Sequence, residues 1–159
     1  MSRVSAFIEG LCRAGAFLSA ICMAAIVILI VLEILLRTFF GFSTMVSSEF
    51  SGYLLVGMVA MSLGYTLDHE AHIRITLIWG VLPLKWKNRV DIGVAAVSVA
   101  VTGFALYHSV LLVQQTYSRG MTADSISETP LWIPQTAIPV GLFLFLLQLV
   151  NFILRRVRQ

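Results

Sequence analysis

The stretch AGAFLSAICMAAIVILIVL, residues 14–32, contains no charged side chain. As an α-helix it would be about 28 Å long at 1.5 Å per residue, close to the roughly 30 Å thickness of a bilayer's hydrocarbon core. It is longer than the apolar region of a secretory signal peptide, and no clear small-residue cleavage site follows Leu36. We therefore predict a retained transmembrane helix at about residues 14–37.

Three further apolar segments of spanning length follow, at about residues 49–67, 91–113 and 135–155. Hydrophobic residues make up 58% of the 159 residues and charged residues only 12%, whereas an average soluble domain is about 25% charged. A soluble protein of this size could not cover so much apolar surface with polar groups. The sequence therefore predicts an all-α membrane protein, with a single membrane domain over residues 1–159 and four transmembrane helices.

Lysine and arginine residues are distributed unevenly between the two predicted sides of the membrane. If the N-terminus is inside, only Arg37 and Arg119 lie outside, and nine of the eleven basic residues lie inside. Such an excess is typical of cytoplasmic loops, so we expect both ends of the chain in the cytoplasm. The basic residues flank apolar segments rather than forming one patch, so we expect no nucleic-acid partner.

The inner connection, at about residues 70–88, is predicted to contain a short helix along the cytoplasmic interface. Its apolar part, residues 73–82, is too short to cross a bilayer. Tryptophan and basic residues favour the lipid headgroups, and we expect these interfacial anchors, the last of them on the outer side: Arg74, Trp79, Lys85, Trp86, Lys87, Arg89 and Trp132. The alternative is a loop that only dips into the interface, because Arg74 interrupts the apolar arc.

A small charge cluster is predicted where spans one and two meet on the outer side. Glu33 and Arg37 are four residues apart and can pair along a helix, while Glu49 is placed to reach Arg37 across the hairpin. We interpret the three as a structural cluster that fixes how the two helices pair, with independent snorkelling as the alternative. A role in an ion or proton path is less favoured, because Glu33 lies about 10 Å from the midplane.

Two features are candidate contact surfaces. Gly57, Ala60 and Gly64 recur on one side of span two, and such a smooth stripe permits close helix contact in lipid. It predicts packing against the other spans of this chain or against a partner. The longest outer connection, residues 114–135, is polar with turn character and is the other candidate, although a plain solvated loop is the default interpretation.

Residues for catalysis or cofactor binding are few. A membrane haem needs two imidazoles that converge on one iron, but His69 and His72 follow span two on the inner side and His108 lies near the outer end of span three. Composition alone suggests a metal cluster at Asp68, His69, Glu70 and His72. Hydrogen bonding and charge balance in a basic loop explain those residues more simply. We therefore expect no enzyme activity and no metal, cofactor or substrate site.

Several short motifs occur in a fixed order between about residues 30 and 145. They are LLRTFF (35–40), SSE (47–49), Gly64, EAHIRI (70–75), Leu82-Pro83, WIP (132–134) and IPVG (138–141). Each motif alone is weak, but the combination at this chain length resembles the small membrane subunit, of DctQ type, of the tripartite ATP-independent periplasmic (TRAP) transporters. One departure is Thr76, which stands where that family often has an acidic residue.

The resemblance implies an accessory or scaffold subunit of the bacterial inner membrane that holds a much larger multispanning transport subunit. It also implies a periplasmic substrate-binding protein that docks transiently and delivers an organic acid. Uptake in the family is usually driven by sodium and uses no ATP. The partners expected from the resemblance are thus two proteins and the surrounding membrane lipids.

Two other functions remain open at this stage. A self-sufficient, homodimeric, proton-coupled exporter with four spans would need a carboxylate deep in span one, where Glu33 is the only candidate. Its near-surface position and the neighbouring Arg37 argue against that role. An anchor subunit of a membrane oxidoreductase would need converging histidines, which the predicted topology does not provide.

Overall fold

The computed structural model describes residues 3–68 and 84–157. Within these ranges the chain forms four long helices, α1 (Arg3–Phe40), α2 (Ser47–Asp68), α4 (Leu84–Ser118) and α6 (Ala137–Val157), and one short helix, α5 (Trp132–Gln135). Four helices, one in each predicted region, are long and apolar enough to cross a membrane. The prediction of an all-helical chain with four such helices is therefore confirmed.

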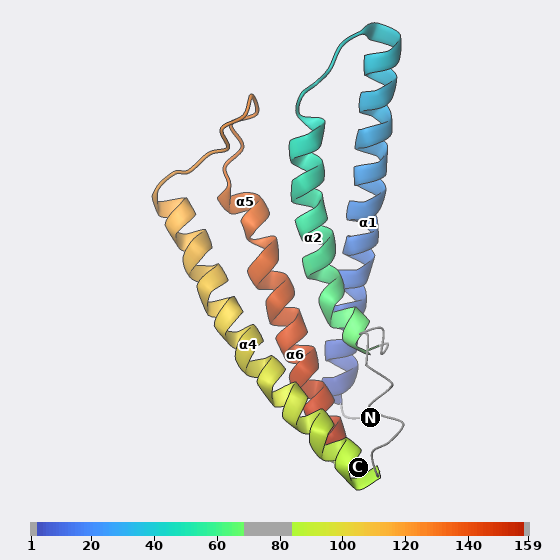
Figure 1. The fold of residues 1–159 in the computed structure, drawn as a ribbon, viewed down its shortest axis with the longest axis vertical. Helices are drawn as coiled ribbons and strands as arrows, with labels where there is room; N and C mark the ends of the chain where they lie inside the picture. Colours follow the sequence, from blue (N-terminus) through green and yellow to red (C-terminus); the bar gives the residue numbers. More distant parts are fainter. Residues whose placement is uncertain (1–2, 69–83, 158–159) are drawn as a thin grey trace.

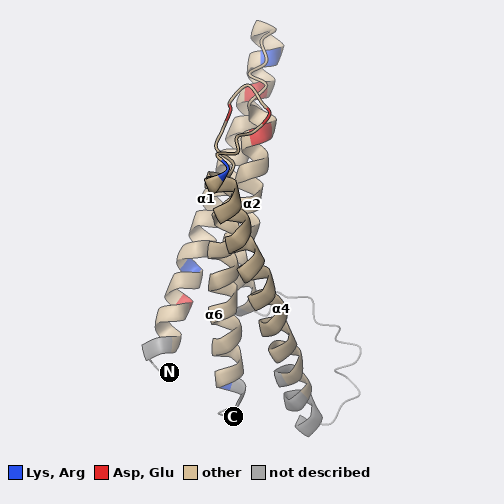
Figure 2. Cartoon of the chain, turned by 90° about the vertical axis from the view of Figure 1, so that its left-hand side faces the viewer, with Lys and Arg blue, Asp and Glu red and all other residues tan. Residues whose placement is uncertain are grey.

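The long helices lie side by side in the order α4, α6, α2, α1 across the molecule (Figure 1). The last helix of the chain thus lies between α4 and α2, and α4 packs on α6 and α5 at one edge of the molecule. The charged residues of the described ranges lie toward the two ends of the molecule and leave a central band without Lys, Arg, Asp or Glu (Figure 2). This band matches the hydrocarbon region of a bilayer.

Small residues allow α2 to approach both of its neighbours closely. A Cβ atom placed on Gly64 would lie 2.8 Å from the sulfur of Cys12 in α1. A Cβ atom placed on Gly141 of α6 would lie 2.6 Å from the Cβ of Ala60. Neither helix separation could therefore be kept with a larger residue at these sites. Because lipid provides no hydrophobic drive for apolar helices to associate, such van der Waals packing holds the bundle together.

Helix α4 buries one narrow side, formed by residues at seven-residue spacing. Ala95, Thr102, Ser109 and Thr116 are buried and small. A seven-residue repeat keeps one side of a helix facing the same neighbour along its length, as in a coiled coil. The hydroxyls of Ser109 and Thr116 donate to carbonyl oxygens of α4 itself, at 2.8 and 2.9 Å. The interface therefore contains polar atoms without leaving these hydroxyls unpaired.

The break between α5 and α6 has its cause in Pro139. A proline lacks the N–H that would bind the carbonyl four residues earlier, and its ring crowds that carbonyl, here the carbonyl of Gln135. The helix therefore ends at Gln135 and restarts at Ala137. Thr136 bridges the two parts, since its N–H donates to the carbonyl of Trp132 at 3.1 Å.

Two helices are longer than the predicted spans. Helix α1 begins at Arg3 and α4 extends beyond residues 91–113 at both ends, because backbone hydrogen bonding continues through polar flanking residues once a helix is formed. Residues 84–88, expected in the interfacial segment, form the first turns of α4. The rest of that segment, with Arg74 and Trp79, lies outside the described residues, as do the side chains of Lys85, Trp86, Lys87 and Arg89.

Candidate functional site

Glu33 anchors the loop that joins α1 to α2. Its carboxylate accepts hydrogen bonds from the Ser43 hydroxyl at 2.7 Å, from the Thr44 backbone N–H at 3.2 and 3.3 Å, and from the Thr44 hydroxyl. All of these donors belong to the loop between α1 and α2, and Glu33 lies two turns before the end of α1. The carboxylate therefore ties the loop back onto the helix that precedes it.

Glu49 anchors the connection between α4 and α5. It lies in the first turn of α2 and accepts a hydrogen bond from the Tyr53 hydroxyl at 2.5 Å. Its second oxygen accepts a hydrogen bond from the hydroxyl of Ser127, which lies 78 positions further along the chain, at 2.9 Å. A carboxylate at a helix N-terminus is also favoured by the helix dipole. Glu49 thus connects the start of α2 to the connection between α4 and α5.

Arg37 is exposed, and among the described residues no ion pair joins it to Glu33 or Glu49. The structure therefore does not bring the three predicted cluster residues into direct contact. Each carboxylate is held by hydroxyl and amide donors of a different loop. In the structure, Glu33 and Glu49 are therefore anchors of two separate loops. The role of these residues in pairing α1 with α2 stays a prediction.

The connection between α4 and α5 is a compact hairpin. It begins at Gly120, whose φ of 60° allows the chain to leave α4 while the N–H of Met121 binds the carbonyl of Thr116 at 3.1 Å. This backbone pattern is the Schellman motif, which satisfies the last carbonyls of a helix. Across the hairpin, the N–H of Ala123 donates to the carbonyl of Thr129 at 3.0 Å. The loop therefore has a defined backbone conformation.

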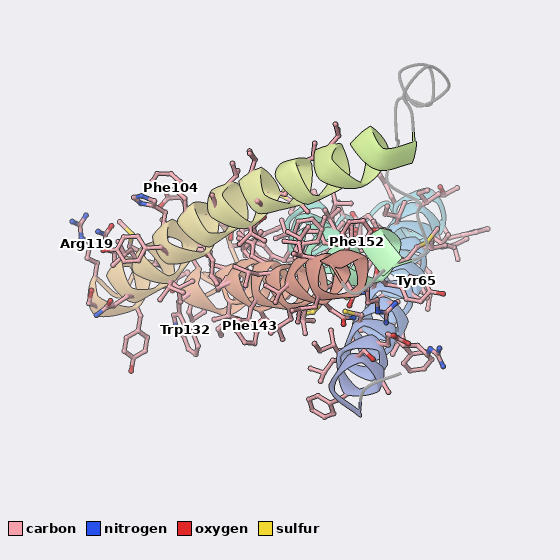
Figure 3. The ribbon with its side chains drawn as sticks, turned by 90° about the horizontal axis from the view of Figure 1, so that it is seen from below. Tyr65, Phe104, Arg119, Trp132, Phe143 and Phe152 are labelled. Carbon is pink, nitrogen blue, oxygen red and sulfur yellow. The ribbon has the colours of Figure 1, made fainter. Side chains whose placement is uncertain are left out.

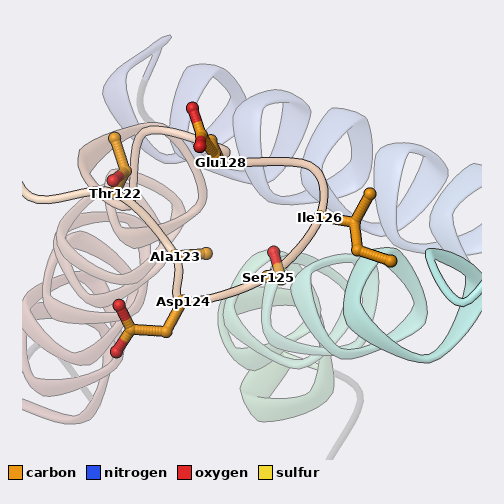
Figure 4. Close-up of a pocket in the computed structure, with 6 residues that line it drawn as sticks. All are labelled: Thr122, Ala123, Asp124, Ser125, Ile126 and Glu128. Carbon is orange, nitrogen blue, oxygen red and sulfur yellow. The ribbon is translucent and has the colours of Figure 1, made fainter.

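The hairpin encloses a shallow, open hollow of about 530 Å³ (Figure 4). Its lining includes the exposed side chains of Asp124 and Glu128, which project away from one another. The hydroxyl of Ser127 lies 3.0 Å from that of Ser125 and 2.8 Å from that of Thr129. It also donates a hydrogen bond to Glu49. The hydroxyls thus hold the loop while its acidic groups face outward.

The small-residue stripe of α2 packs within the chain. Ala60 meets Gly141 of α6, and Gly64 meets Cys12 of α1. A Cβ on Gly57 would lie 3.7 Å from the sulfur of Cys22 in α1. The sequence left open whether this stripe packs against other spans of the same chain or against a partner. In the structure it packs against α1 and α6 of the same chain.

A polar group between the beginning of α1 and the end of α6 was not predicted from the sequence. Glu9 forms an ion pair with Arg155. Gln148 is 2% exposed and accepts a hydrogen bond from Asn151 at 3.5 Å, and its oxygen lies 3.9 Å from the Cys12 sulfur. The sequence contains only a weak signal for this group, three polar residues (Gln148, Asn151 and Arg155) within two turns of an otherwise apolar segment. The partner helix could not be identified from it.

Trp132 packs at the junction of α4 and α5. Its ring meets that of Tyr117 edge to face, with centroids 5.5 Å apart. Such aromatic residues favour the membrane–water interface. Its role as an anchor in lipid remains a prediction.

No group of three or more His, Cys, Asp or Glu side chains able to hold a metal ion occurs among the described residues. The side chains of His69, Glu70 and His72 fall outside them, so the composition-based cluster is not described. His108 lies on α4 and packs against the ring of Phe104, with centroids 4.3 Å apart.

Comparison with known proteins identifies the family. The sequence profile described as the DctQ component of tripartite ATP-independent periplasmic transporters matches residues 26–159. The ectoine TRAP transporter small permease protein TeaB of Halomonas elongata is 26% identical over 101 residues, 64% of this chain and 52% of the relative. A Haemophilus influenzae protein assigned as a TRAP transporter small permease protein is 27% identical over 132 residues, 82% of this chain and 79% of the relative.

The chain therefore spans about half the length of the Halomonas relative and about four fifths of the Haemophilus one. The family profile begins within α1 and extends to the last residue, so it includes every motif that carried the resemblance. Together with the four spanning helices, this match shows that the chain belongs to the DctQ component family of TRAP transporters.

Proposed function

We propose that this chain is an accessory subunit that holds a large multispanning transport subunit in the membrane. The complex would carry out secondary, ion-driven uptake of an organic acid delivered by a periplasmic binding protein. Support comes from the family, which is one component of a tripartite transporter. As a member of it the chain is an inner-membrane protein, and its four long apolar helices suit that location.

The position of the carboxylates carries the proposal. A pump or exporter needs ionisable groups within the membrane to bind and release its coupling ion. Within the described ranges, the central band of the four helices contains no Asp or Glu. Glu33, the candidate for a proton-coupled exporter, is held by Ser43 and Thr44 of the outer loop. This arrangement favours a supporting role over independent transport.

The buried polar side chains of the described helices also favour a supporting role. Ser19 of α1 donates to the carbonyl of Met58 in α2 at 2.8 Å, which links two helices. Gln148 binds Asn151 within α6 and lies against Cys12 of α1. These groups hold helices together rather than lining a path. In the proposed function, the contacts inside the helix bundle keep its helices in fixed relative positions.

Nine of the eleven basic residues support an orientation with both ends in the cytoplasm. In that orientation Glu33, Glu49 and the hairpin between α4 and α5 face the periplasm. The segment before α4 would lie along the inner interface with Arg74 and Trp79 as anchors. The first turns of α4 would add Lys85, Trp86, Lys87 and Arg89, and Trp132 would be the anchor on the opposite side. These placements belong to the proposal.

The substrate class rests on the family resemblance rather than on a site in this chain. An organic acid is proposed, and the name of the Halomonas relative specifies ectoine for that protein. Because the substrate and ion sites are assigned to the large subunit, the substrate has to be measured on the complex.

Native mass spectrometry of the tagged chain tests the proposal. The chain is expressed with its neighbouring genes and purified in mild detergent. One copy bound to one large multispanning protein is the expected result. A homodimer without a second protein, combined with proton-coupled export by the purified chain in vesicles, would instead establish the self-sufficient exporter.

A further inference from the structure

Helix α4 has one side against α6 and a broad side that no described helix covers. The buried residues Ala95, Thr102 and Ser109 define the first side. At 100° per residue, the opposite side carries Gly93, Val97, Ala100, Phe104 and His108, all of them exposed. Phe104 is 68% exposed and lies on the side of α4 away from α6 (Figure 3). This uncovered side of α4, Gly93 to His108, is called the free α4 face below.

His108 distinguishes the free α4 face from a surface made for lipid. It lies six residues before Gln114, where the polar outer end of α4 begins, so it is about 9 Å inside the apolar region. Its imidazole packs beside the rings of Phe104 and Tyr107, with centroids 4.3 and 5.4 Å away. Among the described residues it has no hydrogen-bond partner. A polar group facing acyl chains is unfavourable, and such residues almost always face protein or a cavity.

The outward face of α1 provides the contrast within the same chain. Its exposed residues through the apolar region are Phe17, Ile21, Ala24, Ile28 and Val31. None of them carries a polar side chain, so lipid satisfies this face completely. The free α4 face differs from it because it carries the His108 ring, which can form hydrogen bonds, within the apolar region.

The free α4 face also permits close approach by another helix. A Cβ placed on Gly93 would meet nothing within 4 Å, and Ala100 is exposed one turn from Phe104. Small residues between larger ones let a second backbone come near, as they do at Gly141 inside this chain. Polar complementarity at His108 then selects the partner, because lipid chains offer no acceptor or donor.

We propose that the free α4 face is the surface on which a transmembrane helix of the large transport subunit packs, with a hydrogen-bonding group of that helix opposite His108. This inference rests on the proposed function, since it assumes that a large subunit is present. It leaves the outward face of α1 to lipid. The interface would thus lie at the α4 edge of the molecule and not at the α1 edge.

Two matched substitutions test the proposal in the complex expressed with its neighbouring genes. Ala100→Trp places an indole on the free α4 face, and Ala24→Trp places the same group on the outward face of α1 at a similar depth. The ratio of large to small subunit is measured by native mass spectrometry. We expect about a tenfold lower ratio for Ala100→Trp, from overpacking of the contact, and an unchanged ratio for Ala24→Trp.

The outcomes separate this inference from the proposed function. If the unaltered chain retains a large subunit and Ala24→Trp alone releases it, the α1 face is the interface and the inference fails while the function stands. If neither variant changes the ratio, lipid covers the free α4 face and the inference also fails. If the unaltered chain retains no large subunit, the proposed function itself fails. A homodimer that Ala100→Trp dissociates would assign this face to a second copy and overturn the inference.

His108 variants test the polar contact independently of bulk. His108→Phe keeps a flat ring and removes the hydrogen-bonding nitrogens, and it is expected to lower the subunit ratio about tenfold. His108→Gln keeps a donor and an acceptor and should retain most of the complex. Equal subunit ratios for the unaltered chain and the two His108 variants would contradict the proposal that a hydrogen-bonding group of the partner lies opposite His108. Circular dichroism of each purified chain confirms that the helices are intact.

Discussion

At the scale of single residues, glycines determine how closely α2 approaches α1 and α6, because they have no side chain to separate the helices. Gly64 meets the sulfur of Cys12, and Gly141 meets the backbone and Cβ of Ala60. The stripe that contains Ala60 and Gly64 could be predicted from the sequence. Its partners could not, because small residues indicate that a close contact is allowed without indicating which helix makes it.

Gly141→Leu is expected to destabilise the isolated chain. The new side chain would collide with Ala60 of α2, and overpacking of a close contact costs about 1–3 kcal/mol. The midpoint of thermal unfolding in mild detergent should therefore fall. Gly52→Leu is the control, since a Cβ at Gly52 meets nothing within 4 Å. An equal fall for both variants would contradict the assigned packing.

The predicted charge cluster illustrates the limits of residue-level reasoning. Sequence spacing brought Glu33 and Arg37 onto one side of a helix and predicted a pair between them. In the structure the Ser43 and Thr44 donors of the loop occupy the Glu33 carboxylate. Spacing along a helix contains no information about these loop donors, so it could not predict them, and the pairing of Glu33 with Arg37 stays a prediction.

At the scale of elements, a helix carboxylate holds each of two loops, the one between α1 and α2 and the one between α4 and α5. Glu49 of α2 holds the hairpin between α4 and α5 through Ser127, and the hairpin backbone closes through Ala123 and Thr129. Turn character in this connection was evident from the sequence. Its attachment to α2 was not, because the bond joins residues 78 positions apart.

Glu49→Ala should loosen this hairpin. The substitution removes the charged acceptor that holds Ser127, so the hairpin amides should exchange with solvent deuterium at least about tenfold faster. Hydrogen–deuterium exchange at Ala123 measures this directly. Glu128→Ala removes an exposed carboxylate from the same loop and should leave exchange nearly unchanged. If Glu128→Ala had the larger effect, Glu49 would not be the anchor.

At the scale of the whole molecule, the arrangement α4, α6, α2, α1 leaves two edges, α4 and α1 (Figure 1). Inside the chain, α1 is joined to α6 at one end by Glu9 and Arg155. The bundle is therefore closed by polar contacts near both membrane surfaces and by close packing between them. Such a frame suits a subunit that supports a partner.

The proposed orientation predicts which loops can be labelled from outside. In a chain with Cys12→Ala and Cys22→Ala, a single Ile126→Cys in the exposed hairpin should react with a membrane-impermeant maleimide in spheroplasts. Val157→Cys at the end of α6 should react only after lysis. The reverse pattern would place both ends of the chain in the periplasm and contradict the positive-inside assignment.

Local properties of the sequence determined the number of spans, the all-helical class and the family, because apolar length, charge distribution and short motifs are read from neighbouring residues. Only the tertiary structure decided the spatial order of the helices, the loop donors that Glu33 and Glu49 bind, and the pairing of Glu9 with Arg155. It also decided which side of α4 stays uncovered. These features depend on contacts between segments that are distant in the sequence. In lipid, all four helices present similar apolar surfaces, so the sequence of one helix does not identify its neighbour. Only close packing and polar partners distinguish one helix pairing from another.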